Sequence, residues 1–334
     1  MKTTTLFILF VAFFISGCST KVLINSTKPA IIDRAANTKK VAVLKFENDS
    51  VGLSSKIESA LYSVKVDDKS YFTVISKNSR EVILNEQKFQ YSGLSDRKNS
   101  VEIGELLGAE ALISGKIDSS NMQKDNYYET RYRCVDKKCI YTKEYRVYCT
   151  NAKYSLIANI SMIDVQKGDV IYTNNYIKNR SYKKCSDEGG GLPQSNVVYD
   201  LFAKSIVDEF LPYIAPTKQS YYLELFDDPD ISYTKEQEIF LENGLEYLKL
   251  GELDRSMEIF SKLLNSTNDK CYVASYNLGV IKESLGEYEN AKELYTLSDR
   301  LTLKPNKTVI EAISRIKQRI DEKDRLNSQM EGEK

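Results

Sequence analysis

The side chains that could do acid–base chemistry in this sequence are carboxylates, because the chain of 334 residues contains no histidine. That absence excludes Ser-His-Asp and Cys-His catalysis and disfavours a zinc site. We expect the candidate carboxylates on helix faces or at strand-end turns, where a charge is solvated: Glu86, Asp118, Asp164 and Asp169. Gly104 and Gly108 lack the spacing of a phosphate-binding loop. The sequence therefore predicts no enzyme, no cofactor and no metal.

Cys18 directly follows a short apolar segment at the start of the chain. Lys2 is positive, residues 6–15 (LFILFVAFFI) are apolar, and Ser16 and Gly17 are small. This run is too short to cross a bilayer core of about 30 Å as a helix. The pattern resembles a bacterial lipoprotein signal, which implies cleavage before Cys18 and attachment of lipid (palmitate) to its thiol. By the same resemblance, Ser19 instead of Asp implies the outer membrane, so we expect residues 1–17 to be a signal peptide and the rest to face the periplasm.

Four further cysteines are close together in the sequence: Cys134, Cys139, Cys149 and Cys185. In an oxidising compartment such a cluster predicts two disulfides. A four-cysteine zinc site is the alternative, but the spacing lacks paired C-x-x-C motifs. Three pairings are possible, of which we prefer Cys134–Cys139 across a tight loop with Cys149–Cys185. Cys271 stands alone, and we expect it to be a small buried hydrophobic residue.

Strands and helices alternate in the first half of the chain. After a tether over residues 18–38, apolar runs predict strands at 41–46, 71–75 and 111–117, separated by amphipathic helices at 53–64, 80–89 and 101–108. This order indicates an α/β layer arrangement. The net charge of zero gives no basic field for nucleic acid.

A pattern of period two replaces this alternation after residue 120. Tyr128, Thr130 and Tyr132 point to one side of a predicted strand, which leads through a turn at 136–138 into a returning strand that ends at Cys149. Two long strands follow, 154–165 and 170–182, around a turn at 166–169, and then a helix at 197–214. The sequence thus predicts a β-hairpin extension of the α/β domain.

Four blocks of this region carry a family resemblance: KPAIIDRAANTKKVAVLKFEN, FTVISKNSREVILNEQ, IGELLGAEALISGKI and IANISMIDVQKGDVIYTNNY. In this order they resemble the curli-secretion channel lipoprotein (CsgG-type) superfamily. The resemblance implies a periplasmic α/β sandwich domain over residues 39–215, often assembled into a ring. It further implies either a secretion pore built from hairpins or, in related lipoproteins, a role in envelope assembly without a pore.

The hairpin residues favour the second of these roles. A membrane-spanning strand needs about 9–11 residues with an uninterrupted apolar face. Lys143 interrupts the 126–149 hairpin, and neither face of residues 170–184 is apolar, because Lys178, Arg180, Lys183 and Lys184 lie within it. We therefore prefer a scaffold to a channel.

The C-terminal third contains a repeat. After a linker at 216–234, residues 243–253 (NGLEYLKLGEL) match 277–288 (NLGVIKESLGEY). The match resembles the tetratricopeptide repeat, a helix–turn–helix of about 34 residues. The resemblance implies helix packing through Gly244, Gly251, Phe260, Gly279, Gly286, Ala291, Tyr295 and Pro305. We expect this all-α domain over residues 235–327, closed by a charged helix, with a disordered tail at 328–334.

The sequence as a whole predicts an α+β outer-membrane lipoprotein anchored through Cys18, with no nucleic-acid partner. We expect it to act as a non-enzymatic envelope scaffold that self-associates through the CsgG-like domain and binds a protein through the repeats. A CsgG-type secretion channel for fibre subunits and a lipoprotein activator of a cell-wall synthase are the alternatives.

Overall fold

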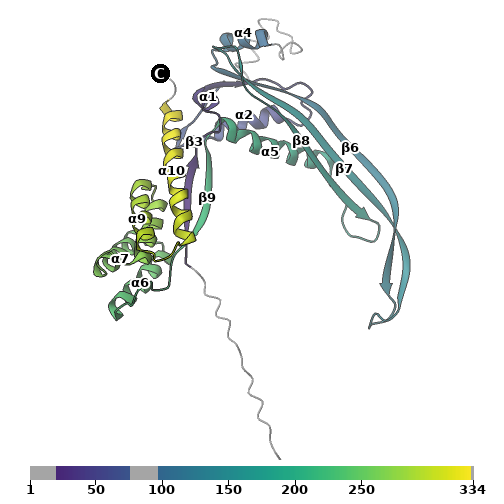
Figure 1. Cartoon of the computed structure of the whole chain (residues 1–334). Coiled ribbons are helices and arrows are strands. Elements are labelled where there is room, and N and C mark those ends of the chain that lie inside the picture. The colour runs from purple at the N-terminus through teal and green to yellow at the C-terminus, as the bar shows by residue number, and fades with distance from the viewer. Residues whose placement is uncertain (1–19, 76–96, 332–334) are drawn as a thin grey trace, which may run out of the picture. The chain divides into compact units, whose positions relative to one another are not determined.

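The computed structural model describes residues 20–75 and 97–331, and it divides the chain into two compact units. The sheet unit comprises Thr27–Thr217 and Lys323–Lys334, and the helical unit comprises Met1–Ser26 and Lys218–Glu322. The mixed content, with helical repeats at the C-terminal end, is the predicted α+β class (Figure 1). The predicted helix at 80–89, with Glu86, lies outside the described residues, as does Cys18.

Among the described residues, the sheet unit is built on a five-stranded sheet in the order β5-β2-β6-β7-β8. Its strands are β2 (Lys40–Val43), β5 (Thr73–Val74), β6 (Ala111–Cys134), β7 (Thr142–Asp164) and β8 (Val170–Cys185). The short β2 is parallel to β5 and β6, whereas β6, β7 and β8 are antiparallel. A separate small hairpin joins β3 (Lys65–Val66) to β4 (Lys69–Ser70).

Helices cover both faces of the inner end of this sheet. On one face, α2 (Leu53–Ser63) and α5 (Ser195–Ile214) bury Leu53, Ile57 and Phe210 against Val41 and Val43. On the other, α4 (Arg97–Leu107) packs Ile103 and Leu107 against Ala42 and Leu44. Because side chains alternate along a strand, β2 contributes to both cores. A short helix, α1 (Asp33–Asn37), precedes β2.

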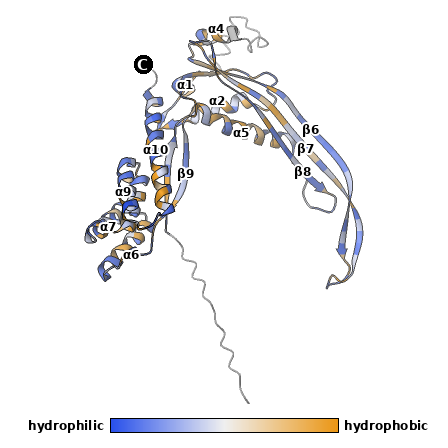
Figure 2. Ribbon diagram, in the orientation of Figure 1, coloured by the Kyte–Doolittle hydropathy of each residue, from blue (hydrophilic) through white to orange (hydrophobic). Residues whose placement is uncertain are grey.

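Two strands are longer than the sequence pattern predicts. The strands expected at 111–117 and 128–134 form the single strand β6, with a bulge between Ile117 and Ser119, and β7 likewise joins two predicted strands. The polar stretch of β6, residues 119–127, pairs along its whole length with β7, although none of its side chains is buried. Figure 2 shows apolar residues along α5 and the inner sheet, with more polar residues toward the outer ends of β6 and β7.

The helical unit contains two helical hairpins. The first is α6 (Lys235–Lys249) with α7 (Leu253–Ser266), and the second is α8 (Tyr272–Ser284) with α9 (Tyr288–Leu301). A capping box between Thr234 and Gln237 starts α6. Gly251 and Gly286 follow α6 and α8 with φ of +80° and +74°, the left-handed conformation that ends a helix.

Glycines at the predicted positions let the paired helices approach closely. A Cβ atom at Gly244 would lie 2.8 Å from the ring of Phe260, and one at Gly279 would lie 2.6 Å from the ring of Tyr295. Ala291 and Tyr295 are fully buried. Pro305 lies in the turn between α9 and the long final helix α10 (Lys307–Glu331).

Three segments expected to be irregular are ordered. The tether contains β1 (Lys21–Lys28) and α1, and the linker contains β9 (Thr217–Glu224), which pairs with β1. Ile24 and Leu223 bury their side chains in the core of the helical unit, which stabilises this pairing. The helix α10 continues through 328–331 because Gln329 is buried, so the prediction of a disordered tail is wrong for these residues.

Candidate functional site

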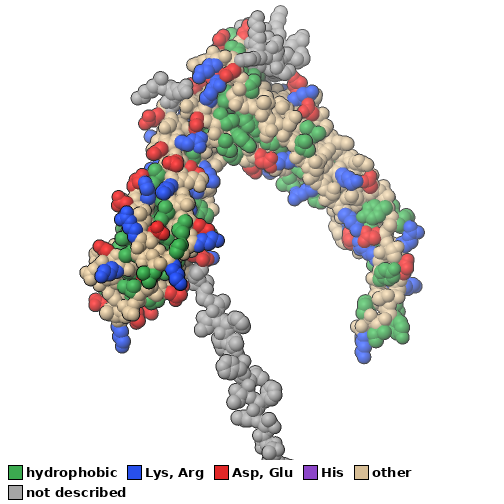
Figure 3. Space-filling model, in the orientation of Figure 1, with side chains coloured by type: hydrophobic (Ala, Val, Ile, Leu, Met, Phe, Trp, Pro, Cys, Tyr) green, Lys and Arg blue, Asp and Glu red, His purple; other side chains and the backbone are tan. Residues whose placement is uncertain are grey.

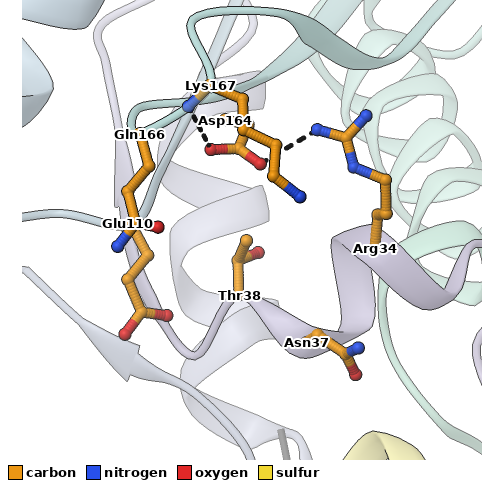
Figure 4. Close-up of a pocket in the computed structure, with 7 residues that line it drawn as sticks. All are labelled: Arg34, Asn37, Thr38, Glu110, Asp164, Gln166 and Lys167. Carbon is orange, nitrogen blue, oxygen red and sulfur yellow. Dashed lines mark hydrogen bonds and ion pairs between the residues drawn. The ribbon is translucent and has the colours of Figure 1, made fainter. Parts of the chain in front are cut away.

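A small polar pocket of about 160 Å³ lies beside α1 in the sheet unit (Figure 4). Its lining residues come from the α1 region, from the residue before β6, and from the end of β7 and the turn that follows it: Arg34, Asn37, Thr38, Glu110, Asp164, Gln166 and Lys167. One of the carboxylates considered for acid–base chemistry, Asp164, lines the pocket, so the electrostatics of the pocket decide whether such chemistry is available there.

Arg34 brings Asp164 and Asp169 together. Its guanidinium donates to Asp164 at 2.9 Å and to Asp169 at 2.7 Å. The hydrogen bonds to Asp169 and then Asp164 raise the pKa of Arg34 above its usual value. Asp164 also accepts from the backbone N–H of Lys167 at 3.0 Å (Figure 4). Both carboxylates therefore belong to an ion-pair network that connects α1 to the turn between β7 and β8.

Two further carboxylates, Glu110 and Asp118, also have partners. Glu110 accepts from the backbone N–H groups of Lys39 and Lys40. Asp118 is paired with Lys116 at 3.4 Å on β6. Arg34 Nε and Asn37 Oδ1 are buried without a hydrogen-bond partner in the part of the chain that the structure describes. The carboxylates of the pocket therefore make structural contacts, which disfavours proton transfer there. No sequence pattern pointed to Arg34, because it lies in the segment expected to be a tether.

Beyond the helices, β6 and β7 continue outward as a ribbon that two disulfides cross-link. Cys149 bonds to Cys185, which holds the end of β8 to β7, and Cys134 bonds to Cys139 across the turn between β6 and β7. This is the preferred pairing from the sequence. A two-stranded ribbon has no core of its own and is marginal in water, so the cross-links replace packing that the ribbon lacks.

Glu129 lies near Cys149 and Cys185, and the three could in principle surround a metal ion. The two sulfur atoms are bonded to each other, however, and a disulfide offers no thiolate ligand. Glu129 is instead paired with Lys183. The two cysteines therefore form a cross-link and do not belong to a metal site.

In the helical unit, α8 is covered on one side by the chain segment that follows β9. The side-chain amide of Asn277 accepts from the backbone N–H of Phe226 at 2.9 Å and donates to its carbonyl at 2.8 Å. The Phe226 ring lies 4.3 Å from that of Tyr276, and Tyr276 donates to the carbonyl of Glu224. An extended segment of this chain thus occupies this surface of α8.

A second surface of the repeats is open. A groove of about 690 Å³ runs over α7, α8 and α9, with an apolar floor that includes Met257, Leu264, Leu278 and Leu294. Its rim carries charged residues of both signs, such as Glu258 and Lys282. Apolar floors with polar rims are typical of peptide-binding grooves.

A buried ion-pair network lies between the repeats and the final helix. Glu283 is fully buried and accepts from Arg315 at 2.9 Å and 3.0 Å, from Tyr295 at 2.7 Å and from Tyr221 at 2.8 Å. Burial first, and then the charge of Glu283, raises the pKa of Tyr295 well above its usual value. In the sequence Glu283 looks like an ordinary charged helix residue, so reasoning from the pattern missed it.

The fold and these surfaces define a two-part protein with an α/β sheet unit and helical repeats. Residues 23–126 match the family model for the curli production assembly/transport component CsgG, and residues 272–304 match a tetratricopeptide repeat. The chain therefore carries a CsgG-type domain followed by a tetratricopeptide repeat, as the sequence resemblance indicated. In the described part of the chain, no helix has the length and apolar character to cross a membrane.

Three solved structures show low similarity. The LpoB C-terminal domain from Salmonella enterica is 13% identical, with 45% of this chain and 95% of that chain covered and a TM-score of 0.26. Lipoprotein GNA1162 from Neisseria meningitidis is 11% identical, with 51% and 96% covered and a TM-score of 0.27. The PelC dodecamer from Paraburkholderia phytofirmans is 13% identical, with 58% and 99% covered and a TM-score of 0.25. No curated protein matches the chain. Such low structural scores carry no conclusion about the function of this chain.

Proposed function

We propose that this protein is a non-enzymatic outer-membrane lipoprotein that acts as an assembly scaffold of the cell envelope. In this proposal, lipid on Cys18 anchors the chain facing the periplasm, the CsgG-type domain self-associates, and the repeats bind a protein partner. The observation that carries the proposal is the open apolar groove over α7, α8 and α9, in a chain that joins a CsgG-type domain to repeats.

The groove is the better candidate for the partner because the chain itself covers another side of α8. Phe226 and its neighbours make backbone hydrogen bonds with Asn277 there. A partner on that side would have to displace these bonds and the buried Leu225. A partner in the groove displaces only water, and we expect it to present apolar side chains to Met257 and Leu294.

Site-specific photo-crosslinking in cells tests this assignment. A photoreactive residue is placed at Met257 or at Leu294, with a matched control at Leu303, a leucine of the same unit that is fully exposed outside the groove. We expect the two groove positions to capture the same envelope protein, and the control to miss it. Identical products from all three positions, or loss of the repeats without effect on envelope assembly, would contradict the proposal.

The anchor is tested separately. Cys18→Ala removes the lipid acceptor, and we expect the variant to leave the outer-membrane fraction. Retention of Cys18→Ala in that fraction would contradict anchoring through this residue. Mass spectrometry of the mature N-terminal peptide, which should begin at acylated Cys18, gives an independent measurement.

A secretion channel is the second candidate, because β6 continues over residues 123–133 without a buried residue. A channel predicts conductance in planar bilayers that is lost when residues 126–149 are deleted. The scaffold predicts no conductance from the intact lipoprotein. Negative-stain imaging of the lipidated protein then shows whether it forms a ring.

A further inference from the structure

The outer end of the ribbon has one covered face and one open face. Because β8 ends opposite Cys149, only β6 and β7 pair beyond that point. On one face, Arg131 donates to Asp187 at 2.8 Å and to Glu188 at 2.9 Å, and the Tyr145 hydroxyl donates to Asp187. On the other face, no segment of the described chain packs against the pair Tyr128 and Tyr148, whose rings contact each other at 5.5 Å.

Large apolar side chains gather at this end and face water. Tyr132 is 67% exposed, and Val135, Ile140 and Tyr141 around the turn are 66%, 68% and 71% exposed. Figure 3 shows hydrophobic and basic side chains together at the end of the ribbon. Contiguous exposed apolar residues at a protein surface mark an interaction site.

The charges at this end are mainly positive. Cations of the two strands and the turn have no acidic partner within 4 Å in the described residues: Arg133, Lys137, Lys138, Lys143 and Arg146. The carboxylate of Asp136 is used within the turn, where it accepts from the backbone N–H groups of Lys138 and Tyr141. Since the net charge of the chain is zero, this is a local basic patch on an otherwise balanced protein.

We propose that the ribbon end, residues 128–148, docks on an anionic phospholipid surface and rests at headgroup depth. Tyrosine prefers the membrane interface, and clustered Lys and Arg are attracted to anionic lipids. The side chains of Val135 and Ile140 enter the upper acyl region while the cations stay with the phosphates. The cations lie on both faces of the ribbon, for example Arg133 on one and Arg146 on the other. The phosphates of a fluid lipid surface can surround the tip and pair with both, whereas one rigid protein surface would reach only one face.

Docking at this depth is distinct from spanning the bilayer. Arg131, Arg133 and Lys143 lie on one face of the paired strands and Arg146 on the other, so neither face is apolar along the length that crossing requires. The disulfide between Cys134 and Cys139 holds the turn in its docking conformation. The segment matched by the CsgG model ends at residue 126, so the match does not cover the ribbon end.

Tryptophan fluorescence tests the proposal directly, because the chain contains no tryptophan. Tyr141→Trp places a unique probe at the tip, and Tyr222→Trp is the matched control, since Tyr222 is 66% exposed on β9 of the helical unit. Both are made in unlipidated protein from Ser19 onward and mixed with phosphatidylcholine vesicles with or without phosphatidylglycerol. We expect a blue shift only for Tyr141→Trp and only with the anionic lipid, weakened by salt.

Charge reversal identifies the residues responsible. Lys137→Glu with Lys138→Glu should weaken vesicle binding about tenfold or more, because each cation near an anionic surface contributes to binding. Lys65→Glu with Lys69→Glu makes the same change of charge in the exposed β3–β4 hairpin of the same unit and should have little effect.

Four outcomes would overturn the inference. Equal loss of vesicle binding in the tip double variant and in the control double variant of the β3–β4 hairpin would show a non-specific charge effect. Quenching of the tip probe by lipids brominated deep in the acyl chains would show insertion instead of docking. Unchanged fluorescence with every vesicle would exclude a lipid surface as the partner. A blue shift of the tip probe that appears with an added acidic protein, and not with vesicles, would exclude it as well.

Discussion

At the scale of single residues, Glu283 of the helical unit accepts hydrogen bonds from three side chains, those of Arg315, Tyr295 and Tyr221. Its carboxylate is fully buried and its charge is compensated by Arg315, whose side chain is 22% exposed. Glu283→Gln keeps the shape but leaves the Arg315 charge without its partner. We expect the opening free energy of the repeats to fall by about 3 kcal/mol, the usual cost of breaking a buried pair.

Hydrogen exchange of residues 272–301 measures this change. Glu289→Gln is the control, because Glu289 forms an exposed pair with Lys292 at 3.5 Å that should contribute less than about 0.5 kcal/mol. Equal effects of the two substitutions would mean that the Glu283 network does not stabilise the unit.

Cys271 is the second residue whose environment sets its chemistry. It is fully buried at the start of α8, where Sγ accepts from the backbone N–H of Ala274 and lies 2.8 Å from the hydroxyl of Tyr233. Burial raises the pKa of the thiol from 9.0 to about 12. The expected small buried residue is therefore present, but with polar contacts that the sequence pattern does not indicate.

We expect native Cys271 to react with maleimide at pH 8 at least about 100-fold more slowly than in urea, because the folded thiol is almost entirely protonated. Since the folded pKa is the higher one, the neutral thiol stabilises the fold fully below pH 9.0, and this contribution is lost as the pH rises toward about 12. Rapid labelling of folded protein at pH 8 would contradict this account.

At the scale of elements, the sequence predicts the buried parts well and the solvent-exposed parts less well. The strands at 111–117 and 154–165 and the helix at 197–214 follow from apolar periodicity, because burial imposes it. The missed strands β1 and β9 are mainly polar on their outer face, and they pair with each other although more than half of the length of the chain separates them. No local pattern encodes such a distant pairing.

Residues of the candidate sites likewise differ in how well they can be predicted from the sequence. The cysteine cluster and the repeat glycines are recognisable because their spacing carries the signal. Arg34, Asn277 and Glu283 acquire their roles only from residues far away in the sequence, such as Asp169 for Arg34. Their partners could not be predicted without the fold.

The disulfides give a prediction for the ribbon as an element. Cys149→Ala with Cys185→Ala removes a cross-link buried beside Val147, and closing this loop should contribute about 3–4 kcal/mol to the local stability. We expect faster hydrogen exchange in residues 142–150 and 177–185. Cys134→Ala with Cys139→Ala should confine the change to the turn, and exchange unaltered in both variants would show that strand pairing alone holds the ribbon.

At the scale of the whole molecule, the final helix contributes residues to both units. Residues 307–322 of α10 belong to the helical unit, whereas the residues from Lys323 onward belong to the sheet unit. In the sheet unit, the buried amide of Gln329 accepts from the backbone N–H of Ala30 at 2.9 Å and donates to the carbonyl of Ala30 at 3.0 Å. The end of the chain thus completes the hydrogen bonding of a segment nearly 300 positions earlier in the sequence.

Ending the chain after Glu322 should therefore weaken the sheet unit while the repeats keep their fold. Gln329→Ala isolates the contribution of the amide, whose loss leaves two backbone groups of Ala30 unpaired in a buried position at a cost of about 2–3 kcal/mol. Gln318→Ala, in an exposed part of the same helix, is the matched control. Hydrogen exchange should rise in residues 27–37 for the truncation and for Gln329→Ala and stay unchanged for Gln318→Ala. If residues 272–301 opened instead, α10 would be part of the helical unit alone.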